Sequence, residues 1–391
     1  MFEGSTIEIS RAALRNNLSF IHGLLGRDTC LYSVVKGNAY GHGVEVFAPM
    51  ALDLGVKDFA VYSASEALTL YEAIQGAAGI YILGDVDGEA LEWAIAHGIA
   101  FNVFERQRLV ESARLARLLG TRALIHLEIE TGMNRTGFPP EDLPAILKWC
   151  AGALDAFEIK GVCTHLAGAE SRANAFRVHE QKERFREALQ AVNESGLKVE
   201  LRHAACSAGI LNEPDMLLDM ARVGILQYGF WPNKETEVRF RKGLAPGPDP
   251  LQRVIRWCSR IMSTTSVEQG HFVGYGTTYF AQEDQRLAVV PVGYAHGYAR
   301  SLSNAGQVLV RGQVAPVRGI VNMNCITVDI TGIEGVEKGD EVVLIGTQGE
   351  RSVSVSSFGE RSDQLNYELL TRLPLSIPRV AVEEHDRHGL S

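Results

Sequence analysis

The chain has 391 residues, of which 46% are hydrophobic and 22% charged, and its formal net charge is −9 at pH 7. This composition supports a sizeable core, excludes global disorder and argues against a general nucleic-acid binder. The length suggests two domains, or one large barrel with an appendage. No apolar stretch approaches membrane-spanning length and no signal peptide is evident. The six cysteines have no paired spacing that would indicate a metal site, and this is typical of free thiols in a reducing cytoplasm. We therefore expect a cytoplasmic protein that binds neither a membrane nor a metal.

The first part of the chain alternates short apolar strands with amphipathic helices. A strand at 6–9 precedes a helix that Ser10 caps, and further helices are predicted near 65–74, 88–97 and 106–119. Eight strands are predicted in series, at 32–36, 59–62, 80–83, 100–103, 124–128, 159–163, 198–201 and 224–227. Eight alternating units predict an α/β fold, a TIM-type (β/α)8 barrel. An open doubly wound sheet is the alternative, but no early strand is followed by a Gly-x-Gly-x-x-Gly turn.

Near residue 241 the pattern changes. Residues 242–250 are rich in Pro and Gly, as in a linker. Short β-rich segments follow, at 255–262, 287–292, 307–310, 317–321, 326–330 and 341–344, with one more helix near 365–371. The sequence therefore predicts a barrel domain at 1–240, whose residues 1–9 can also pair with the other domain, and a smaller, mostly β C-terminal domain at 241–391.

One strand ends at a lysine with unusual surroundings. The apolar segment from Leu31 to Val35 leads into Lys36, and three glycines, an asparagine and a histidine in the following residues predict an irregular continuation. A lysine held at the end of an apolar strand is partly desolvated, which lowers its pKa and leaves the nucleophilic amine that Schiff-base chemistry requires. The alternative is a lysine that extends from a barrel mouth into water.

The strand at 124–128 leads into a second polar segment. Side chains point to alternate faces of a strand. One face should therefore carry His126, Glu128 and Glu130, and the opposite face should carry the apolar residues between them. We expect the polar set to face the barrel lumen. Buried carboxylates need a cation, and Arg135 is the natural bidentate partner. A purely structural ion pair is the alternative interpretation.

Two segments resemble the sequence motifs of alanine racemases. Residues 35–43, Val-Lys-Gly-Asn-Ala-Tyr-Gly-His-Gly, are similar to the pyridoxal-phosphate lysine motif of that family, and residues 131–137 are similar to its Thr-Gly-Met-x-Arg-x-Gly block. The resemblance implies that Lys36 carries pyridoxal 5'-phosphate covalently and that Tyr40 contacts its phosphate. It also implies that Arg135 reaches the cofactor oxygen and the substrate carboxylate.

Further blocks extend the resemblance over essentially the full chain. It implies that His165 orients a catalytic tyrosine and that Arg222 faces the pyridine nitrogen. The implied phosphate contacts are Ser207, the backbone N–H groups of Gly224 and Ile225, and Tyr367. Arginine has no acceptor and stays charged, so the ring nitrogen would stay unprotonated, which suppresses transamination.

Racemisation needs a base on each face of the substrate. Residues 273–276, Val-Gly-Tyr-Gly, resemble a family motif whose tyrosine comes from the second subunit. The resemblance therefore implies Lys36 and Tyr275 as the two bases, in a homodimer with shared active sites. A tyrosine needs cationic neighbours to lower its pKa from about 10, and His165 backed by Arg222 is the proposed relay.

Three positions depart from the family pattern. Glu128 stands where many members have a carbamylated lysine, and we interpret it as a fixed substitute. His296 and Asn324 replace aspartates of blocks that also contain Tyr294 and Met323, and the resemblance places Tyr294, Met323 and Asn324 on the substrate side. The predicted function is interconversion of L- and D-alanine, a step toward D-alanine and peptidoglycan precursors. The alternatives are a broad-specificity or serine racemase, or a non-catalytic pyridoxal-phosphate-binding protein; a decarboxylase of this fold would want an acidic partner for the ring nitrogen.

Overall fold

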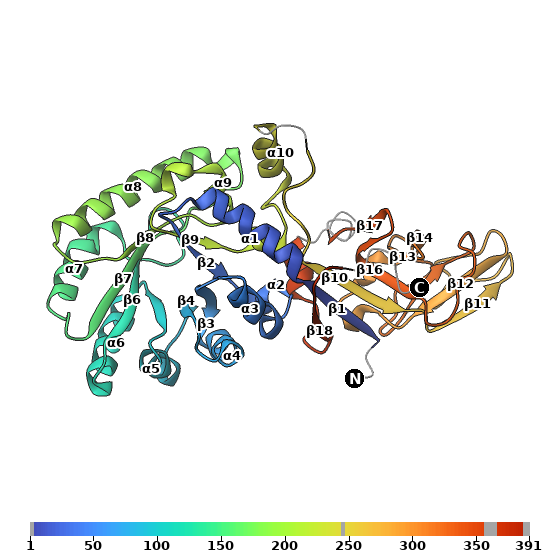
Figure 1. The fold of residues 1–391 in the computed structure, drawn as a ribbon, viewed down its shortest axis with the longest axis horizontal. Helices are drawn as coiled ribbons and strands as arrows, with labels where there is room; N and C mark the ends of the chain where they lie inside the picture. The colour runs from blue at the N-terminus through green and yellow to red at the C-terminus, as the bar shows by residue number, and fades with distance from the viewer. Residues whose placement is uncertain (1–3, 244–246, 356–365, 386–391) are drawn as a thin grey trace. The chain divides into compact units, whose positions relative to one another are not determined.

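The computed structural model describes residues 4–243, 247–355 and 366–385, and the chain forms two compact units (Figure 1). The first unit, the barrel unit, consists of Leu14–Gly37 and Ala48–Gln252. The second, the β unit, consists of the described parts of Met1–Ala13, Asn38–Phe47 and Arg253–Ser391. The division predicted at residues 240 and 241 stays a prediction.

The barrel unit contains an 8-stranded parallel sheet that is nearly closed. Its strand order is β8-β7-β6-β5-β4-β3-β2-β9. The strands are β2 (Cys30–Val34), β3 (Asp58–Ser63), β4 (Gly79–Asp85), β5 (Ala100–Val103), β6 (Ala123–Glu128), β7 (Phe157–Cys163), β8 (Leu201–His203) and β9 (Met220–Val223). The two ends of the sheet meet through Asp219 N–H, which donates to Arg202 O at 3.1 Å, and Arg222 N–H, which donates to Ala205 O at 3.0 Å. The predicted (β/α)8 barrel is confirmed.

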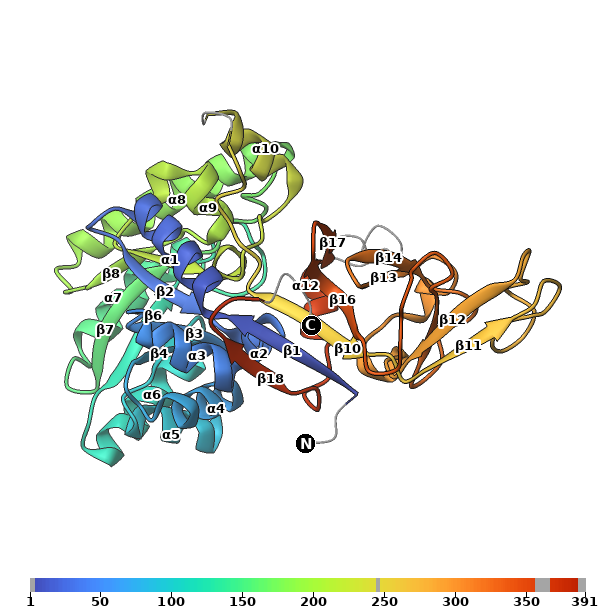
Figure 2. The same cartoon turned by 45° about the vertical axis from the view of Figure 1, so that its right-hand side comes forward.

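Amphipathic helices surround these strands, as Figures 1 and 2 show for α4 to α8. The helices wholly within the barrel unit are α4 (Ala64–Ile74), α5 (Gly88–Ala96), α6 (Arg106–Leu119), α7 (Leu143–Ala151), α8 (Ala175–Glu194), α9 (Ser207–Asn212) and α10 (Lys234–Lys242). The helices α1 (Arg11–Leu25), α2 (Lys36–Tyr40) and α3 (Val44–Asp53) each have residues in both units. In α4 the Ser63 side chain caps the first turn, and Ala67, Leu70 and Ile74 are buried at helical spacing. None of the helices in the described residues combines the length and hydropathy needed to span a bilayer.

Two of the predicted barrel strands are misplaced. The segment 224–227 is not a strand, because Ile225–Tyr228 forms a 3-10 turn, η4, and the eighth strand is β9. The charged Arg222 interrupts the apolar pattern of β9, yet its side chain is buried and bonded to backbone carbonyls. The seventh strand begins only at Leu201, where pairing with β7 starts.

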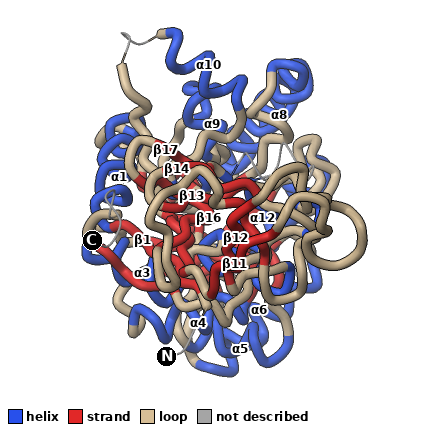
Figure 3. Tube along the Cα trace, turned by 90° about the vertical axis from the view of Figure 1, so that its right-hand side faces the viewer, coloured by secondary structure: helices blue, strands red, loops and turns tan. Residues whose placement is uncertain are grey.

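The β unit is built from two antiparallel-rich sheets (Figure 3). The larger has the order β14-β13-β16-β10-β1-β18 with β17 on β16, and the smaller the order β11-β12-β15. The strands are β1 (Ser5–Ser10), β10 (Ile255–Arg260), β11 (Ser263–Val267), β12 (Gln285–Val290), β13 (Gln307–Val310), β14 (Gln313–Pro316), β15 (Ile326–Asp329), β16 (Glu341–Gln348), β17 (Arg351–Val353) and β18 (Arg379–Val382), with the helix α12 (Asn366–Thr371).

The N-terminal strand β1 belongs to this sheet, since it pairs with β10 and β18. The strand predicted at 317–321 is wrong: this segment makes one isolated bridge, from Val317 to Val328, and the strand lies just before it in β14. The predicted mostly β C-terminal domain is confirmed. The helix predicted near 365–371 corresponds to α12, and residue 365 lies outside the described residues.

Candidate active site

Lys36 lies just beyond β2, two residues after its last residue. Val35 N–H donates to Ala60 O at 2.8 Å, which ties the end of β2 to β3. The Lys36 side chain is exposed in part, yet enough protein surrounds its ammonium group to desolvate it. Desolvation, reinforced by the positive charge of Arg135, lowers the pKa of Lys36. The structure therefore holds a primary amine that is both reachable and easily deprotonated.

A left-handed turn follows Lys36, where the sequence predicted an irregular segment. The φ angles are 61°, 54°, 53°, 52° and 82° from Gly37 to Gly41. Gly and Asn tolerate this region, but Ala39 and Tyr40 each carry strain of about 1–2 kcal/mol. Glu66 Oε1 accepts a hydrogen bond from Gly37 N–H at 2.6 Å and so fixes the residue next to Lys36. Strain of this kind persists only where the surroundings impose it, and it is frequent at functional sites.

Strand β6 places two polar side chains inside the barrel. His126 is fully buried and Glu128 is 7% exposed. Glu128 accepts hydrogen bonds from Thr136 Oγ1 at 3.0 Å and Asn102 Nδ2 at 3.3 Å, and burial raises its pKa. The expected lumen position of His126 and Glu128 is thus found.

The partners predicted for this strand differ from those found. Glu130 does not join the lumen set: its carboxylate accepts hydrogen bonds from the N–H groups of Gly132, Asn134 and Arg135. The Arg135 side chain is exposed and, among the described residues, forms no ion pair with Glu128 or Glu130. The bidentate pair predicted for Arg135 is therefore wrong. The loop turns the guanidinium toward solvent, and Thr136 takes its place on Glu128.

Arg222 is the buried cation of the barrel and is 7% exposed. Its guanidinium donates to Nδ1 of His203 and to the backbone oxygens of Thr164, at 2.8 Å, and Ala204, at 3.3 Å. His203 Nε2 lies 2.9 Å from His126 Nδ1, and the ring of Tyr81 stacks on His126 with centroids 4.1 Å apart. A chain of polar groups thus leads from Arg222 across the barrel interior.

His165 follows β7 and stands in a cationic environment. Burial, assisted by the positive charges of Arg222, Arg135 and Lys36, lowers the pKa of His165 to about 3. The imidazole is therefore neutral at pH 7 and can accept a hydrogen bond on its unprotonated nitrogen. None of the hydrogen bonds of Arg222 in the described residues reaches His165, so Arg222 influences His165 only through its electrostatic field, and the relay stays a prediction.

Ser207 and Gly224 lie together at the same end of the barrel. Cys206 forms an isolated parallel bridge with Arg222, and Gly224 N–H donates to Ser207 Oγ at 3.1 Å. Gly224 N–H is therefore already occupied, whereas Ile225 N–H has no partner among the described residues. The structure brings together Lys36, Arg135, His165, Ser207, Arg222, Gly224 and Ile225 within the barrel unit.

The other predicted residues lie in the β unit. Tyr40 and Tyr367 meet edge to face, with ring centroids 6.2 Å apart. Gly41 allows this approach, because a Cβ there would collide with Leu370 O of α12. Tyr275 is 75% exposed between two glycines of positive φ.

The substrate-side residues predicted in the β unit form one surface. Tyr294 N–H donates to Asn322 O at 3.0 Å and Ala295 N–H donates to Met323 O at 2.9 Å, so the two loops run side by side. Tyr294, Met323 and Asn324 are exposed there. His296 has a different role, since its Nδ1 accepts a hydrogen bond from Gly293 N–H at 3.2 Å within the same loop.

Sequence reasoning missed two residues of the barrel interior, Tyr81 and Asn102. The Tyr81 hydroxyl donates to Asn102 Oδ1, and the Asn102 amide donates to Glu128. Tyr81 and Asn102 each interrupt an otherwise apolar strand. A polar side chain in such a strand is the sequence feature that could have identified them as lumen residues. No group of three or more His, Cys, Asp or Glu side chains in the described part of the chain could hold a metal ion.

Comparison with known proteins gives the family. Residues 9–232 match the description "Alanine racemase, N-terminal domain" and residues 254–381 match "Alanine racemase, C-terminal domain". The chain belongs to the alanine racemase family. The resemblance predicted from the motifs is confirmed, and as a member of this family the chain is an amino-acid racemase, an isomerase.

Alanine racemases are also the relatives found by sequence and by structure. The alanine racemase of Halothermothrix orenii is 35% identical over 372 residues, which cover 95% of each chain. The solved alanine racemase of Clostridium difficile 630 has a TM-score of 0.89 at 29% identity, covering 100% of this chain and 98% of that one. The alanine racemase of Bartonella henselae, solved with covalently bound pyridoxal phosphate, has a TM-score of 0.82 at 25% identity, covering 97% of this chain and 100% of that one.

Proposed function

We propose that this chain interconverts L- and D-alanine with pyridoxal 5'-phosphate as cofactor, and that Lys36 and the partner subunit's Tyr275 are the two bases. The observation that carries the proposal is the position of Lys36 just beyond β2, at the start of a left-handed turn that Glu66 fixes through Gly37 N–H. Desolvation and the positive charge of Arg135 lower the pKa of Lys36 there. A lowered pKa increases the share of unprotonated amine, which can bind an aldehyde covalently and can accept a proton.

The residues around Lys36 fit this cofactor. Ser207 Oγ accepts a hydrogen bond from Gly224 N–H, so its own proton is available to donate to a phosphate oxygen. Ile225 N–H is available as a second donor, and Gly224 N–H would become a third if Ser207 turned toward the phosphate. Arg222 offers only donors, so it suits a neutral ring nitrogen and cannot hold a proton between itself and the ring. When bound, pyridoxal phosphate withdraws electrons from the substrate α-carbon and makes its proton acidic.

The proposed roles of the side chains follow from what each can donate or accept. Arg135, exposed and without an ion-pair partner among the described residues, is suited to bind the substrate carboxylate. Lys36 removes or returns the α-proton on one face, and the partner subunit's Tyr275 does so on the other. Burial, assisted by the surrounding cations, lowers the pKa of His165 and keeps it neutral, so it can accept a hydrogen bond from that tyrosine hydroxyl.

The exposure of Tyr275 supports a shared site in a homodimer. The side chain is 75% exposed, and its hydroxyl makes no hydrogen bond within the described residues of its own chain. Phe272 and Phe280 pair edge to face at 5.1 Å beneath the same loop and are 53% and 42% exposed. Exposed aromatic residues clustered on one loop are typical of an interface with a partner.

A broader substrate range is the second candidate. Asn324 is exposed on the surface that it shares with Tyr294 and Met323, and it places a neutral amide where the family usually has a carboxylate. An amide can accept or donate a hydrogen bond to a substrate hydroxyl. Serine is therefore the substrate to compare with alanine.

The test uses the purified protein with pyridoxal phosphate added. We expect L-alanine to be converted to an equal mixture of enantiomers, followed by optical rotation, and D-alanine to give the same end point. Turnover of L-serine at a comparable kcat/KM would favour the broader racemase. Covalent cofactor binding without any change in rotation would show a non-catalytic binding protein and refute the proposal. A supply of D-alanine for peptidoglycan in the cytoplasm is the cellular role we propose for this activity.

A further inference from the structure

A helix of the barrel unit forms hydrogen bonds to two loops that carry proposed active-site residues. The loop after β6 carries Arg135, and the segment after β7 carries His165. Helix α8 follows, and Gln181 on its inner face is fully buried. Gln181 Oε1 accepts a hydrogen bond from Ala167 N–H at 2.7 Å. Gln181 Nε2 donates to His165 O at 3.0 Å and to Thr131 Oγ1 at 3.2 Å.

These three hydrogen bonds determine the orientation of the Gln181 amide. A backbone N–H can only donate and a backbone oxygen can only accept, so the oxygen must face Ala167 and the nitrogen must face His165. Among side chains of this length, a primary amide offers a donor and an acceptor together without any change of protonation. An ionised glutamate cannot donate to His165 O, and methionine can do neither. The position therefore requires glutamine for a reason that packing alone does not give.

The Arg135 loop depends on side chains for its backbone hydrogen bonds. Glu130 accepts from the N–H groups of Gly132, Asn134 and Arg135. Thr131, fully buried, contacts Gln181 on one side and Thr164 Oγ1, at 2.7 Å, on the other. The Thr131 hydroxyl thus joins this loop both to α8 and to the residue before His165.

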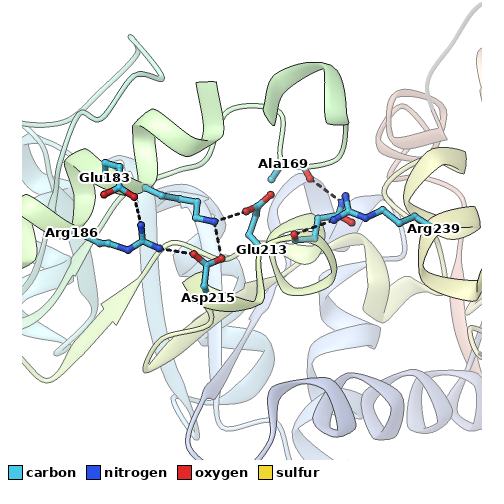
Figure 4. Close-up of polar contacts among 8 residues, drawn as sticks. Ala169, Glu183, Arg186, Glu213, Asp215 and Arg239 are labelled. Carbon is cyan, nitrogen blue, oxygen red and sulfur yellow. Dashed lines mark hydrogen bonds and ion pairs between the residues drawn. The ribbon is translucent and has the colours of Figure 1, made fainter. Parts of the chain in front are cut away.

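Helix α8 itself is firmly anchored, so it can act as a fixed support. Lys182 forms ion pairs of 2.7 Å with both Glu213 and Asp215, and its side chain is only 12% exposed. Figure 4 shows Glu213 and Asp215 turned toward α8, with Arg186 bonded to Asp215 and Glu183. The chain after α9 is thereby held to the same helix as the two loops.

We propose that Gln181 is a positioning residue that couples the Arg135 loop to the His165 segment, so that the substrate carboxylate and the proton-relay imidazole are held in a fixed mutual placement. The proposal deepens the proposed function and rests on the roles given there to Arg135 and His165. Gln181 is fully buried and acts through its hydrogen bonds to Thr131, His165 and Ala167.

The test compares Gln181→Met and Gln181→Glu with Arg184→Met and Gln190→Met. Among the described residues, Arg184 donates to Thr131 O of the Arg135 loop at 3.2 Å and forms an ion pair with Glu180 on α8 at 4.0 Å, and Gln190 bonds only Glu194 on α8 itself. Misplacement of reacting groups by about 1 Å can cost about 100-fold, so we expect both Gln181 variants to lower kcat by about 10- to 100-fold and to raise KM for alanine. Cofactor content should stay unchanged.

Backbone hydrogen–deuterium exchange supplies a readout apart from activity. In both Gln181 variants, the backbone N–H groups of peptides 130–136 and 164–168 should exchange faster. The faster exchange should include the N–H groups of Gly132, Asn134 and Arg135, which donate to Glu130 and not to Gln181. Arg184→Met should affect only peptide 130–136, and Gln190→Met neither. Wild-type kcat and KM in a folded Gln181→Met protein would overturn the proposal, as would faster exchange confined to 164–168.

Two further outcomes remain decisive. If Gln181→Met and Gln181→Glu do not fold, Thr131→Val removes the hydrogen bonds of this hydroxyl to both Gln181 and Thr164, whereas Thr164→Val removes only the bond between the two threonines. Exchange at 164–168 should be faster in Thr131→Val than in Thr164→Val, and equal exchange in the two variants would refute the coupling through Gln181. If the wild-type protein racemises no amino acid, the proposed function fails, while the exchange experiment still decides whether Gln181 couples the two segments.

Discussion

The guanidinium of Arg222 donates a hydrogen bond to Nδ1 of His203, and this one contact fixes the protons of two imidazoles. Arginine is an obligatory donor, so His203 Nδ1 must be unprotonated and His203 Nε2 must carry the proton. That proton is donated to His126 Nδ1 at 2.9 Å, which leaves the His126 proton on Nε2. Both rings are therefore neutral, and burial lowers the pKa of His126 to about 3 and that of His203 well below its usual range.

The neutral imidazoles predict a loss of stability in acid. Because the folded pKa values lie below the ordinary value of 6.5, the unfolded chain binds more protons than the folded one between pH 6.5 and about 3. The free energy of unfolding should fall as pH falls through this range, by up to about 1.4 kcal/mol per pH unit for each imidazole. Urea denaturation at several pH values measures this slope.

A pair of variants isolates the contribution of the buried pair. His203→Ala removes one imidazole that titrates on unfolding, so the free energy of unfolding should change less steeply with pH, by the equivalent of up to one bound proton. The same variant should lose about 1–3 kcal/mol of unfolding free energy at pH 7, because Arg222 and His126 each lose a hydrogen-bond partner. His22→Ala, at an exposed site on α1, is the matched control and should leave both quantities unchanged. An unaltered slope in His203→Ala would contradict the tautomer assignment.

Lys36→Ala is expected to abolish covalent cofactor attachment and racemisation together. The reason is that no other amine in the described barrel interior has a pKa lowered in this way, and loss of the nucleophile and base should reduce kcat by about 10³-fold or more. Attachment is measured by the visible absorbance of the protein and by the mass added after borohydride reduction. A reducible adduct in the variant would show that another residue carries the cofactor.

The sequence was sufficient to predict the barrel, the β unit and the position of Lys36, because hydrophobic alternation and a dense motif carry that information. The sequence pattern misplaced the eighth strand, because a charged Arg222 interrupts the apolar residues of Met220–Val223. Its charge is nevertheless buried, where it donates to backbone carbonyl oxygens. The Arg135–Glu128 pair was wrong, because sequence distance does not show which way a loop turns. Gln181 carried no signal at all, since the loops it joins are distant in sequence and meet only in the folded barrel.

Tyr275→Phe is expected to lower racemisation by about 10²- to 10⁴-fold while leaving the cofactor attached. Phenylalanine keeps the ring but cannot accept or return a proton, so one face of the substrate loses its base. Solvent deuterium should then enter preferentially from D-alanine, the enantiomer on which the family resemblance places the proton of Lys36. Proton exchange measured by NMR for each enantiomer separates the two bases, and equal loss from both would argue against a two-base mechanism.

Mixed dimers test whether each site draws on two chains. Inactive Lys36→Ala and inactive Tyr275→Phe proteins are mixed, dissociated and reassociated. In a mixed dimer, one site combines both intact residues and the other combines both substitutions. Activity should therefore return, to about half of the wild-type value per mixed dimer. Mixtures that stay inactive, although the exchange of subunits is confirmed by mass, would place Tyr275 in the same chain's site.

Glu128 is held by Thr136 and Asn102 and not by Arg135, which changes what its removal should do. Arg135 is exposed, so no buried arginine is left unpaired when Glu128 is replaced. Burial raises the pKa of Glu128, so the folded chain binds this proton more tightly than the unfolded chain. The carboxyl therefore contributes less stability as pH rises above its ordinary value of 4.5. Glu128→Gln should leave the free energy of unfolding at pH 7 unchanged or slightly higher.

The same substitution should damage activity, because it deletes a negative charge that acts on both Arg222 and Arg135. We expect Glu128→Gln to lower kcat by about tenfold or more while the protein stays at least as stable as wild type. A glutamate is permanent, so wild-type turnover should not respond to bicarbonate. Glu128→Lys should instead regain activity only when bicarbonate is supplied, because a lysine carbamate restores a carboxylate on a longer arm. Wild-type turnover in Glu128→Gln would show that this carboxylate does not stand in for the lysine carbamate that the family resemblance implies.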